Sequence, residues 1–589
     1  MLDRTEKNMK KILSLVLVLS LLLGSALVLT SCGAPENEGA QIPVYLGEPI
    51  YDFDPTDYYV DSNADQLMSL LFEPLFSVNK KGKLEEAAAK KYEVNEEERT
   101  ITIELRETYW SDGSRVLASD YIYAWRDVIL DPTKANPAAA LFYDIENAVE
   151  IKKGEASSYE FGATGSLYEI TIIYREGADY EQLLMNLASV ATAPLRQNGV
   201  AQSSSYWSKN INSIYTNGPF KVEALDYEDG IITVARNLGY HQNPNKVDYD
   251  NEVNPHLLTS TFEVDGKSVE VSYADIEKKV VFIMTDATLA DRSANKGEAK
   301  TYDDLSTYTY VFDTTNPLFA KKEVRQALSL VIDRNAIINA ITFGKAADGF
   351  VAPLAAKDIE QSLISASANK AAAEQLLAGV DLTGISKSFT LTVNDDAESI
   401  AIAEIVKTAW ESIGFNVTIK AVGVIESTVI DFANNTQISV RDSEIQYLVK
   451  EASKGNVQYD VIAVDWQMYS TDPFVALAAL TSDMNGCGAI FNDAETTLRP
   501  NISGWSNAEY DALINAAYST ANDDARNGYL KEAEKILMDE MPIIPLLFNE
   551  TFVFTAKGIS KVSVDGLGNL SFSDVKLKKY EKYLPNEEE

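Results

Sequence analysis

The sequence predicts a protein of the α/β class, and one stretch of it carries the clearest signal. Between residues 389 and 419, apolar side chains first alternate with polar ones, then recur at helical spacing, and then alternate again. Gly414 stands where the helical pattern stops. A strand, a helix and a second strand in this order predict a β-α-β unit with parallel strands and a right-handed crossover.

Length and composition support this class and extend it. A chain of 589 residues is too long for one compact core, so about three or four structural units are expected. The chain is 46% hydrophobic and 24% charged, which is ordinary for a soluble protein and argues against general disorder. Neither an internal repeat nor a long low-complexity segment is present.

Other elements follow from local patterns. Alternating apolar residues at 101–105 predict a half-buried strand. Ser119 is predicted to cap the helix that follows at 120–129. Residues 506–509 have the spacing of a capping box that opens at Ser506, and Pro542 ends another helix.

The charged and reactive residues exclude several classes of function. A net charge of −37 repels phosphate backbones and anionic lipid, so nucleic-acid binding is not expected. His241 and His256 are the only histidines, and HExxH is absent, which disfavours a metal site or a Ser-His-Asp triad. Cys487 has no histidine nearby in sequence and is expected to be inert. We therefore expect no enzyme, no metal and no cofactor.

The N-terminus predicts export. Three lysines precede an apolar run at 12–29, which ends in the sequence LTSC at Cys32. This ending resembles a bacterial lipobox, so residues 1–31 are expected to be a lipoprotein signal peptide and Cys32 to carry the lipid. A transmembrane anchor is the alternative for a run of this length. Residues 32–42 are small and polar, as in a flexible tether. The first methionine or Met9 can be the start.

Residues 465–473, DWQMYSTDP, are the first candidate for a ligand site. They follow a buried-looking strand at 459–464 and precede an apolar run at 474–480. The carboxyl end of a strand is a favoured place for a ligand in an α/β sheet. The turn is rich in aromatic and carboxylate side chains, so we expect it to hold a solute.

Six further stretches follow one another along the chain: LFEPLFSVNKKGKLEEAAAKKYEV (71–94), WSDGSRVLASDYIYAWR (110–126), TNGPFKV (216–222), ARNLGY (235–240), VRQALSLVIDRNAII (324–338) and MPIIPLL (541–547). Taken together and in this order, they resemble the bacterial extracellular solute-binding proteins of family 5, which serve peptide ABC importers. The motifs also predict local structure: Gly113 and Gly218 lie in turns, and Asp333 caps a helix. The resemblance covers about 43–575.

The resemblance implies a two-lobed, periplasmic-binding-protein-like α/β fold, with an extra subdomain in lobe one and a cleft that closes at a hinge. The implied bounds are lobe one at 43–72, 191–308 and 545–589, its subdomain at 73–190, and lobe two at 309–544.

The implied function is capture of peptides by a monomeric lipoprotein on the outer face of the cytoplasmic membrane, for delivery to an ABC permease and its ATPases. Two alternatives remain open. The same fold can bind a non-peptide solute such as an oligosaccharide, for which the 30 tyrosines and 6 tryptophans are suited. The protein can also be a surface receptor for signalling or adhesion.

The resemblance also implies ligand-binding residues. They are Tyr59, Val60 and Asp61 in lobe one, and Asp465, Trp466, Gln467 and Tyr469 in lobe two. Peptide-binding relatives usually carry an aspartate at the position of Tyr469, where it pairs with the ligand's ammonium group. A phenol is neutral at pH 7, so the sequence predicts peptides with blocked or internal amines, or a neutral solute. Asp61, Asp465 and Asp472 are possible substitutes, with Asp472 expected to cap the next helix.

Overall fold

The computed structural model describes most of the chain. The described residues are 41–47, 50–56, 62–202, 206–226, 231–237, 239–241, 256–260, 262–264, 267–269, 271–278, 281–431, 436–486, 501–571 and 575–578. Cys32, Cys487 and the segment Tyr59, Val60 and Asp61 lie outside them, as do the predicted signal peptide and most of the tether. No helix within these ranges is long and apolar enough to cross a membrane.

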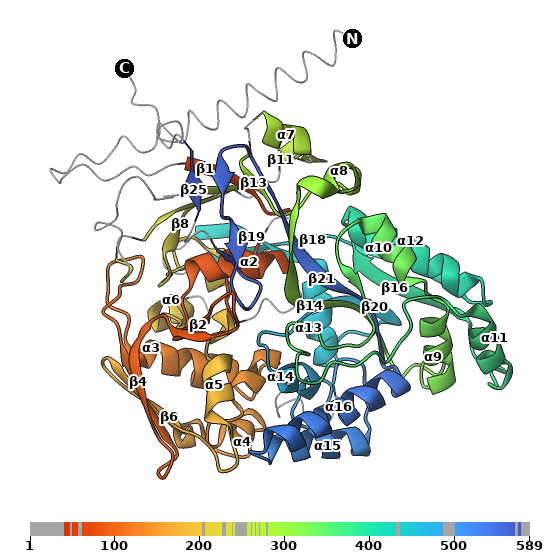
Figure 1. Ribbon diagram of the computed structural model, residues 1–589, viewed down its shortest axis with the longest axis horizontal. Coiled ribbons are helices and arrows are strands. Elements are labelled where there is room, and N and C mark those ends of the chain that lie inside the picture. Colours follow the sequence, from red (N-terminus) through yellow and green to blue (C-terminus); the bar gives the residue numbers. More distant parts are fainter. Residues whose placement is uncertain are drawn as a thin grey trace, which may run out of the picture.

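An eleven-stranded sheet runs through the described part of the molecule (Figure 1). Ten strands follow the order β17-β16-β20-β14-β21-β13-β1-β10-β9-β8, and β15 pairs with β21. The bounds are β1 Gln41–Tyr45, β8 Phe220–Asp226, β9 Ile231–Arg236, β10 His256–Ser260, β13 Ile283–Met284, β14 Lys300–Phe312, β15 Lys345–Ala346, β16 Ser388–Asn394, β17 Asn416–Val422, β20 Val461–Gln467 and β21 Ile543–Thr555. Parallel and antiparallel pairs occur in this one sheet and helices flank it, which confirms the α/β class.

β14 and β21 lie at the centre of the sheet and are 13 residues long each. They pair antiparallel from Lys300 to Val311 of β14, with a register shift between Asp303 and Thr307. Beyond the shift β14 also pairs with β20, whereas the far end of β21 pairs with β13. Both strands therefore run from one half of the sheet to the other, as connections around a hinge do.

The predicted β-α-β unit is present. β16 and β17 are parallel over seven residue pairs, and α12 (Ala397–Glu411) connects them. Asp333 caps α10 (Arg334–Ile341) as predicted, with its carboxylate accepting from the amide of Ala336. α9 (Lys322–Leu330), α11 (Lys370–Ala378) and these elements enclose a separate cluster of buried apolar side chains.

The region 73–190 contains a sheet of its own, in the order β4-β5-β7-β6. Its strands are β4 Ala89–Asn95, β5 Thr100–Leu105, β6 Ala163–Ser166 and β7 Glu169–Ile173. Buried and half-buried residues alternate along β5, as its sequence predicted. The turns predicted at the two glycines are also found: Gly113 has a φ of +82°, and residues 216–219 lead into β8.

Two predicted helix caps are wrong by one or two residues. The helix α3 (Ala118–Ile122) begins after Leu117, because the carboxylate of Asp120 accepts from the Leu117 amide at 2.9 Å. Ser119 therefore lies inside the first turn. In α15 (Ala508–Tyr518) the cap is Asn507, not Ser506, because the Asn507 side chain accepts from two amides of the first turn.

The remaining helices and strands complete the described part of the chain. The other helices are α2 Ser62–Leu71, α4 Ala148–Lys152, α5 Tyr180–Asn186, α6 Gln197–Gln202, α7 Tyr273–Glu277, α8 Leu289–Asn295, α13 Glu444–Ser453, α14 Pro473–Ala478, α16 Asp523–Glu540, the π-helix η1 Tyr123–Ile129 and the 3₁₀ turns η2 Pro137–Phe142, η3 Ser158–Glu160, η4 Val190–Thr192, η5 Trp207–Lys209 and η7 Lys296–Glu298. The other strands are β2 Phe76–Val78, β3 Leu84–Glu86, β11 Phe262–Val264, β12 Lys267–Val269, β18 Val424–Asp431, β19 Thr436–Ser443, β22 Ile559–Ser560, β23 Ser563–Val564, β24 Leu570–Ser571 and β25 Lys576–Leu577.

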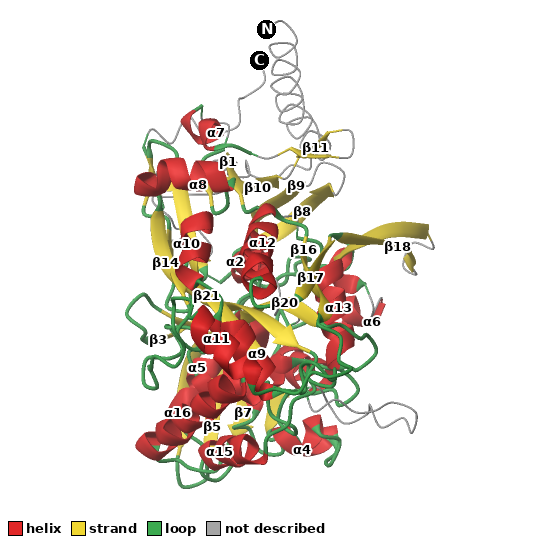
Figure 2. Ribbon diagram, turned by 90° about the vertical axis from the view of Figure 1, so that its right-hand side faces the viewer, coloured by secondary structure: helices red, strands yellow, loops and turns green. Residues whose placement is uncertain are grey.

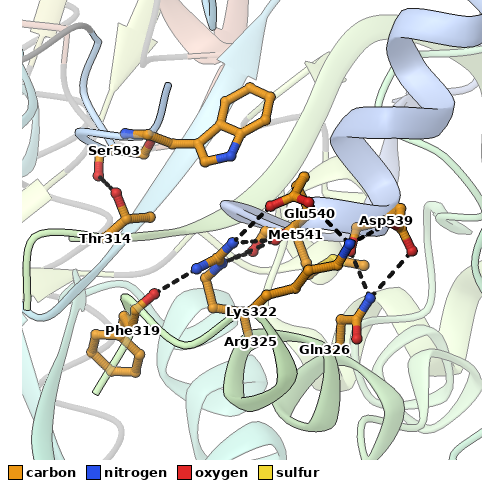
Figure 3. Close-up of polar contacts among 10 residues, drawn as sticks. Thr314, Phe319, Lys322, Arg325, Gln326, Ser503, Asp539, Glu540 and Met541 are labelled. Carbon is orange, nitrogen blue, oxygen red and sulfur yellow. Dashed lines mark hydrogen bonds and ion pairs between the residues drawn. The ribbon is translucent and has the colours of Figure 1, made fainter. Parts of the chain in front are cut away.

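Two of the family-like stretches meet at the end of α16 (Figure 3). The Arg325 guanidinium donates to the carbonyl oxygens of Phe319 at 2.6 Å, Glu540 at 2.6 Å and Met541 at 3.2 Å. The last carbonyls of a helix lack helical partners and carry partial negative charge, so a buried cation satisfies both needs. Burial lowers the pKa of Arg325 to about 10, which leaves it charged at neutral pH.

We expect Arg325→Met to lower the free energy of unfolding by about 3 kcal/mol, because buried carbonyls lose a charged donor. Gln326→Met is the matched control on the same helix, since Gln326 donates to Asp539 from an exposed position. Its expected cost is under about 0.5 kcal/mol. Chemical denaturation of both variants measures the difference, and equal losses would contradict this role of Arg325.

Candidate ligand-binding site

β20 carries three of the predicted ligand residues. It pairs antiparallel with β14 along its whole length, from Val461 to Gln467. On its other side, β16 pairs with it only at Val461 and Ile462. From Ala463 onward, β14 is therefore the one strand neighbour of β20 among the strands that the structure describes. An added strand can continue the sheet at this edge.

Trp466 lies at the end of this strand and is fixed by packing. Its ring meets that of Phe350 edge to face, with centroids 5.4 Å apart. The backbone of Phe350 is held in turn: its amide donates to the Glu534 carboxylate at 2.8 Å, and its carbonyl accepts from Thr307 at 2.9 Å. The indole is thus a preformed wall of the site. Phe350 and Glu534 are far from β20 in sequence, and no local pattern indicated them.

Asp465 is tied to the crossing strands. The amide nitrogen of Asn549 on β21 donates to Asp465 at 2.6 Å and to Ser306 on β14 at 2.7 Å. Ser306 donates to Asp304, which also accepts from Thr551 at 2.9 Å. Burial raises the pKa of Asp304. This polar cluster lies at the register shift of β14, so it links the candidate site to the two strands that cross the sheet.

Gln467 and the turn after it are held by main-chain contacts. The Gln467 side chain accepts from the Met468 amide at 3.1 Å, and the same amide donates to the Leu305 carbonyl at 2.9 Å. Tyr469 follows with a φ of +58° and an exposed fraction of 5%. That conformation is uncommon for a bulky side chain, so its surroundings hold it. Ser470 donates to Asn186 at the end of α5, at 2.6 Å.

Asp472 caps α14, as expected. One carboxylate oxygen accepts from the Phe474 amide at 3.0 Å, and the other accepts from Arg526 at 2.8 Å. The side chain is 1% exposed. Both oxygens are engaged within the fold, so Asp472 is excluded as a substitute anchor for a ligand's ammonium group.

Side chains of the region 73–190 surround Asp472 and Arg526. Arg175 pairs with Asp144 at 2.5 Å and stacks 3.7 Å above the ring of Tyr518 on α15. The Tyr518 hydroxyl donates to the Tyr143 carbonyl at 3.2 Å. Burial raises the pKa of Asp144 even though Arg175 and Arg526 oppose the shift. The turn 465–473 is therefore enclosed from a second side.

Thr56 is the last described residue before the predicted lobe-one segment, Tyr59 to Asp61. The Thr56 carbonyl accepts from the side chain of Asn136 at 3.0 Å, and the Asn136 amide donates to the Gly486 carbonyl at 2.8 Å. Three parts of the chain meet here, next to that segment. Within the described part of the chain, no three His, Cys, Asp or Glu side chains form a cluster that could hold a metal ion.

Comparison with known proteins identifies the family. The model of the bacterial extracellular solute-binding proteins, family 5 (middle region), matches residues 83–486. The chain is 24% identical to the oligopeptide-binding protein OppA of Bacillus subtilis, covering 88% of this chain and 89% of that protein. It is 26% identical to the murein peptide-binding protein MppA of Escherichia coli, with 82% of each covered.

Solved structures agree on the fold. The Escherichia coli murein tripeptide-binding protein MppA superposes with a TM-score of 0.73 at 22% identity, over 92% of this chain and 99% of that one. Haemophilus influenzae OppA in complex with RPPGFSPFR superposes with a TM-score of 0.72 at 20% identity, over 92% of this chain and 100% of that one. The two-lobed fold predicted from the resemblance is thus confirmed. The chain belongs to the family 5 bacterial extracellular solute-binding proteins, which bind solutes for transport and are not enzymes.

Proposed function

We propose that this protein is the peptide-capturing component of an ABC importer, delivering its ligand to a membrane permease driven by ATPase subunits. Family membership and the names of the relatives support it, since OppA and the dipeptide-binding protein DppE of Bacillus subtilis bind peptides by name. The observation that carries the proposal is the end of β20. Beyond Ile462 it diverges from β16, and an extended peptide backbone fits such an edge.

In this proposal the ligand lies between two main-chain segments. Asp465, Trp466 and Gln467 pair with it from lobe two, and Tyr59 to Asp61 pair with it from lobe one. Strand addition of this kind gives affinity that depends little on side chains. The buried Trp466–Phe350 pair then forms a wall for one side chain of the peptide.

Closure of the lobes completes the proposed cycle. The described lobes touch each other at Ser470 and Asn186 and at Gly486 and Asn136. The superposition on the unliganded open form of MppA is poorer, with a TM-score of 0.56 against 0.73 for the other MppA structure. A ligand bound between the lobes stabilises the closed state by its differential affinity, and a permease can read that state.

Denaturing mass spectrometry of the purified protein should release peptides. Methylating successive backbone nitrogens of a recovered peptide should lower its affinity stepwise, by about tenfold for each main-chain hydrogen bond lost. Calorimetric titration measures the affinities, and a glycan pool is the control. Tight binding of a glycan, or indifference to methylation at every position, would favour the oligosaccharide alternative. Absence of any small ligand would favour a surface receptor.

Ligand chemistry is the finer part of the proposal. With Tyr469 at the position where an aspartate is expected and Asp472 engaged inside the fold, a charged anchor for a free N-terminus has few candidates. Asp465 already accepts from Asn549. We therefore propose that the site prefers peptides with blocked or internal amines, or a neutral solute.

Acetylating the N-terminal amine of a recovered peptide tests this preference. Because no buried ion pair is lost, we expect the dissociation constant to change by less than about tenfold. The same peptide acetylated on a lysine side chain is the control. A loss of a hundredfold or more on N-terminal acetylation would show a charged anchor and overturn the preference.

The cellular location of the protein is also proposed from its sequence. We propose that Cys32 carries a lipid and that the mature monomer is held at the outer face of the cytoplasmic membrane. The family name supports an extracellular place. Cys32→Ala should move the protein from the membrane fraction to the soluble extracellular fraction with unchanged ligand affinity, measured by fractionation and calorimetry. Retention and processing identical to the parent protein would exclude lipidation at Cys32.

A further inference from the structure

The hairpin β18–β19 reaches from one lobe to the other. Its two strands pair over eight residue pairs, and Figure 2 shows β18 extending from the body of the molecule. The bounds proposed from the sequence assign the hairpin to lobe two. The Tyr206 hydroxyl, just before η5 in lobe one, donates to the carbonyl of Ile430 on β18. A second contact joins Lys209 of η5 to Asp442 of β19.

Lys209 also serves a carboxylate of its own lobe. Its ammonium group lies 3.6 Å from Asp52, and its side chain is only 11% exposed. The charge of Lys450, on α13 of the proposed lobe two, also lowers the pKa of Asp52. Charges of opposite sign therefore alternate in the order Lys450, Asp52, Lys209, Asp442. The two inner charges come from lobe one and the two outer ones from lobe two.

The pKa of Asp52 agrees with this arrangement of charges. Burial alone would raise its pKa, but the charges of Lys209 and Lys450 and a hydrogen bond from Ser208 outweigh burial and hold the pKa below its ordinary value. Asp52 is thus ionised at neutral pH in a half-buried place. In the closed arrangement the two cations stabilise this half-buried charge.

Asp52 stands at the start of the segment that leads to the proposed ligand residues. The Phe53 amide donates to the Ser208 carbonyl at 2.9 Å, which joins this segment to η5. Thr56, at its other end, accepts from Asn136 of the lobe-one subdomain, whose backbone amide donates in turn to Gly486 of lobe two. Residues 52–56, which lead to Tyr59, are therefore linked to lobe two at both ends.

We propose that Lys209, Asp52, Asp442 and Lys450 form an electrostatic clasp that assembles when the lobes close, and that Lys209 is its positioning residue. The inference rests on the proposed closing of the lobes around a solute. Opening separates the outer charges from the inner pair and returns all four groups to water. The clasp therefore adds stability to the closed state and slows release of the solute, in a salt-dependent way.

Asp442→Asn tests the clasp with little risk to folding, because Asp442 is the most exposed of the three groups in the two ion pairs of Lys209, at 34%. Glu426→Gln is the matched control: it makes the same change of charge in the same hairpin, where Glu426 pairs with Arg441 at 2.9 Å. Lys209→Met removes the positioning cation itself.

Small-angle scattering of the ligand-free mature chain, at about 0.05 and about 0.5 M salt, measures the closed fraction. The clasp predicts that salt opens the parent protein and the Glu426→Gln variant. Asp442→Asn should lower the ratio of closed to open molecules by about fivefold at low salt, and this ratio should then depend less on salt. Release of the co-purified solute, followed by dilution and mass spectrometry, should accelerate by a similar factor.

Two results would overturn the clasp: a closed fraction in Asp442→Asn that equals that of the parent at both salt concentrations, or an equal change in Glu426→Gln. If Lys209→Met fails to fold, Asp442→Asn still decides the question. If the closed fraction of the parent protein depends on salt but the protein binds no peptide, the proposed function is contradicted and the clasp is not. The two inferences can thus fail separately.

Discussion

The antiparallel pairing of β14 with β21 is the constraint on which the rest of the structure depends. These strands are the centre of the sheet and also the connections between its two halves. The candidate site is attached to them directly: Asn549 holds Asp465, Thr307 holds Phe350 against Trp466, and the carbonyl of Leu305 holds the turn. A movement at the register shift of β14 therefore also moves the end of β20 that carries the candidate site, which would couple the proposed binding to the proposed closure.

Local sequence patterns were sufficient to predict elements whose partners are close to them in the sequence. The β-α-β unit at 388–422 consists of two strands and a helix that follow one another directly in the chain, and its pattern predicted it. The helix caps show the limit. Asp120 and Asn507 replace the predicted Ser119 and Ser506, because capping depends on which side chain reaches a particular amide. Several neighbouring residues are chemically able to do so.

The candidate site was only partly predictable. The turn after β20 could be located because a buried strand ends there, and Asp472 could be recognised as a helix cap. Its surroundings could not, since Phe350, Glu534 and Asn186 come from segments far away in the chain. Residues such as Arg325 look like ordinary helix surface in the sequence. Their partners are backbone carbonyls, which every residue has, so no side-chain pattern marks them.

The acidity of the chain makes closing the lobes an electrostatic problem. With 88 acidic residues against 51 basic ones, two approaching surfaces bring like charges together and repel. The structure places cations between carboxylates at these contacts. Lys209 lies between Asp52 and Asp442, and Arg292 bridges Asp286 and Glu398 in the same manner. Each cation attracts the carboxylates on both sides of it, so in the proposed closure these few basic residues oppose the general repulsion between the lobes.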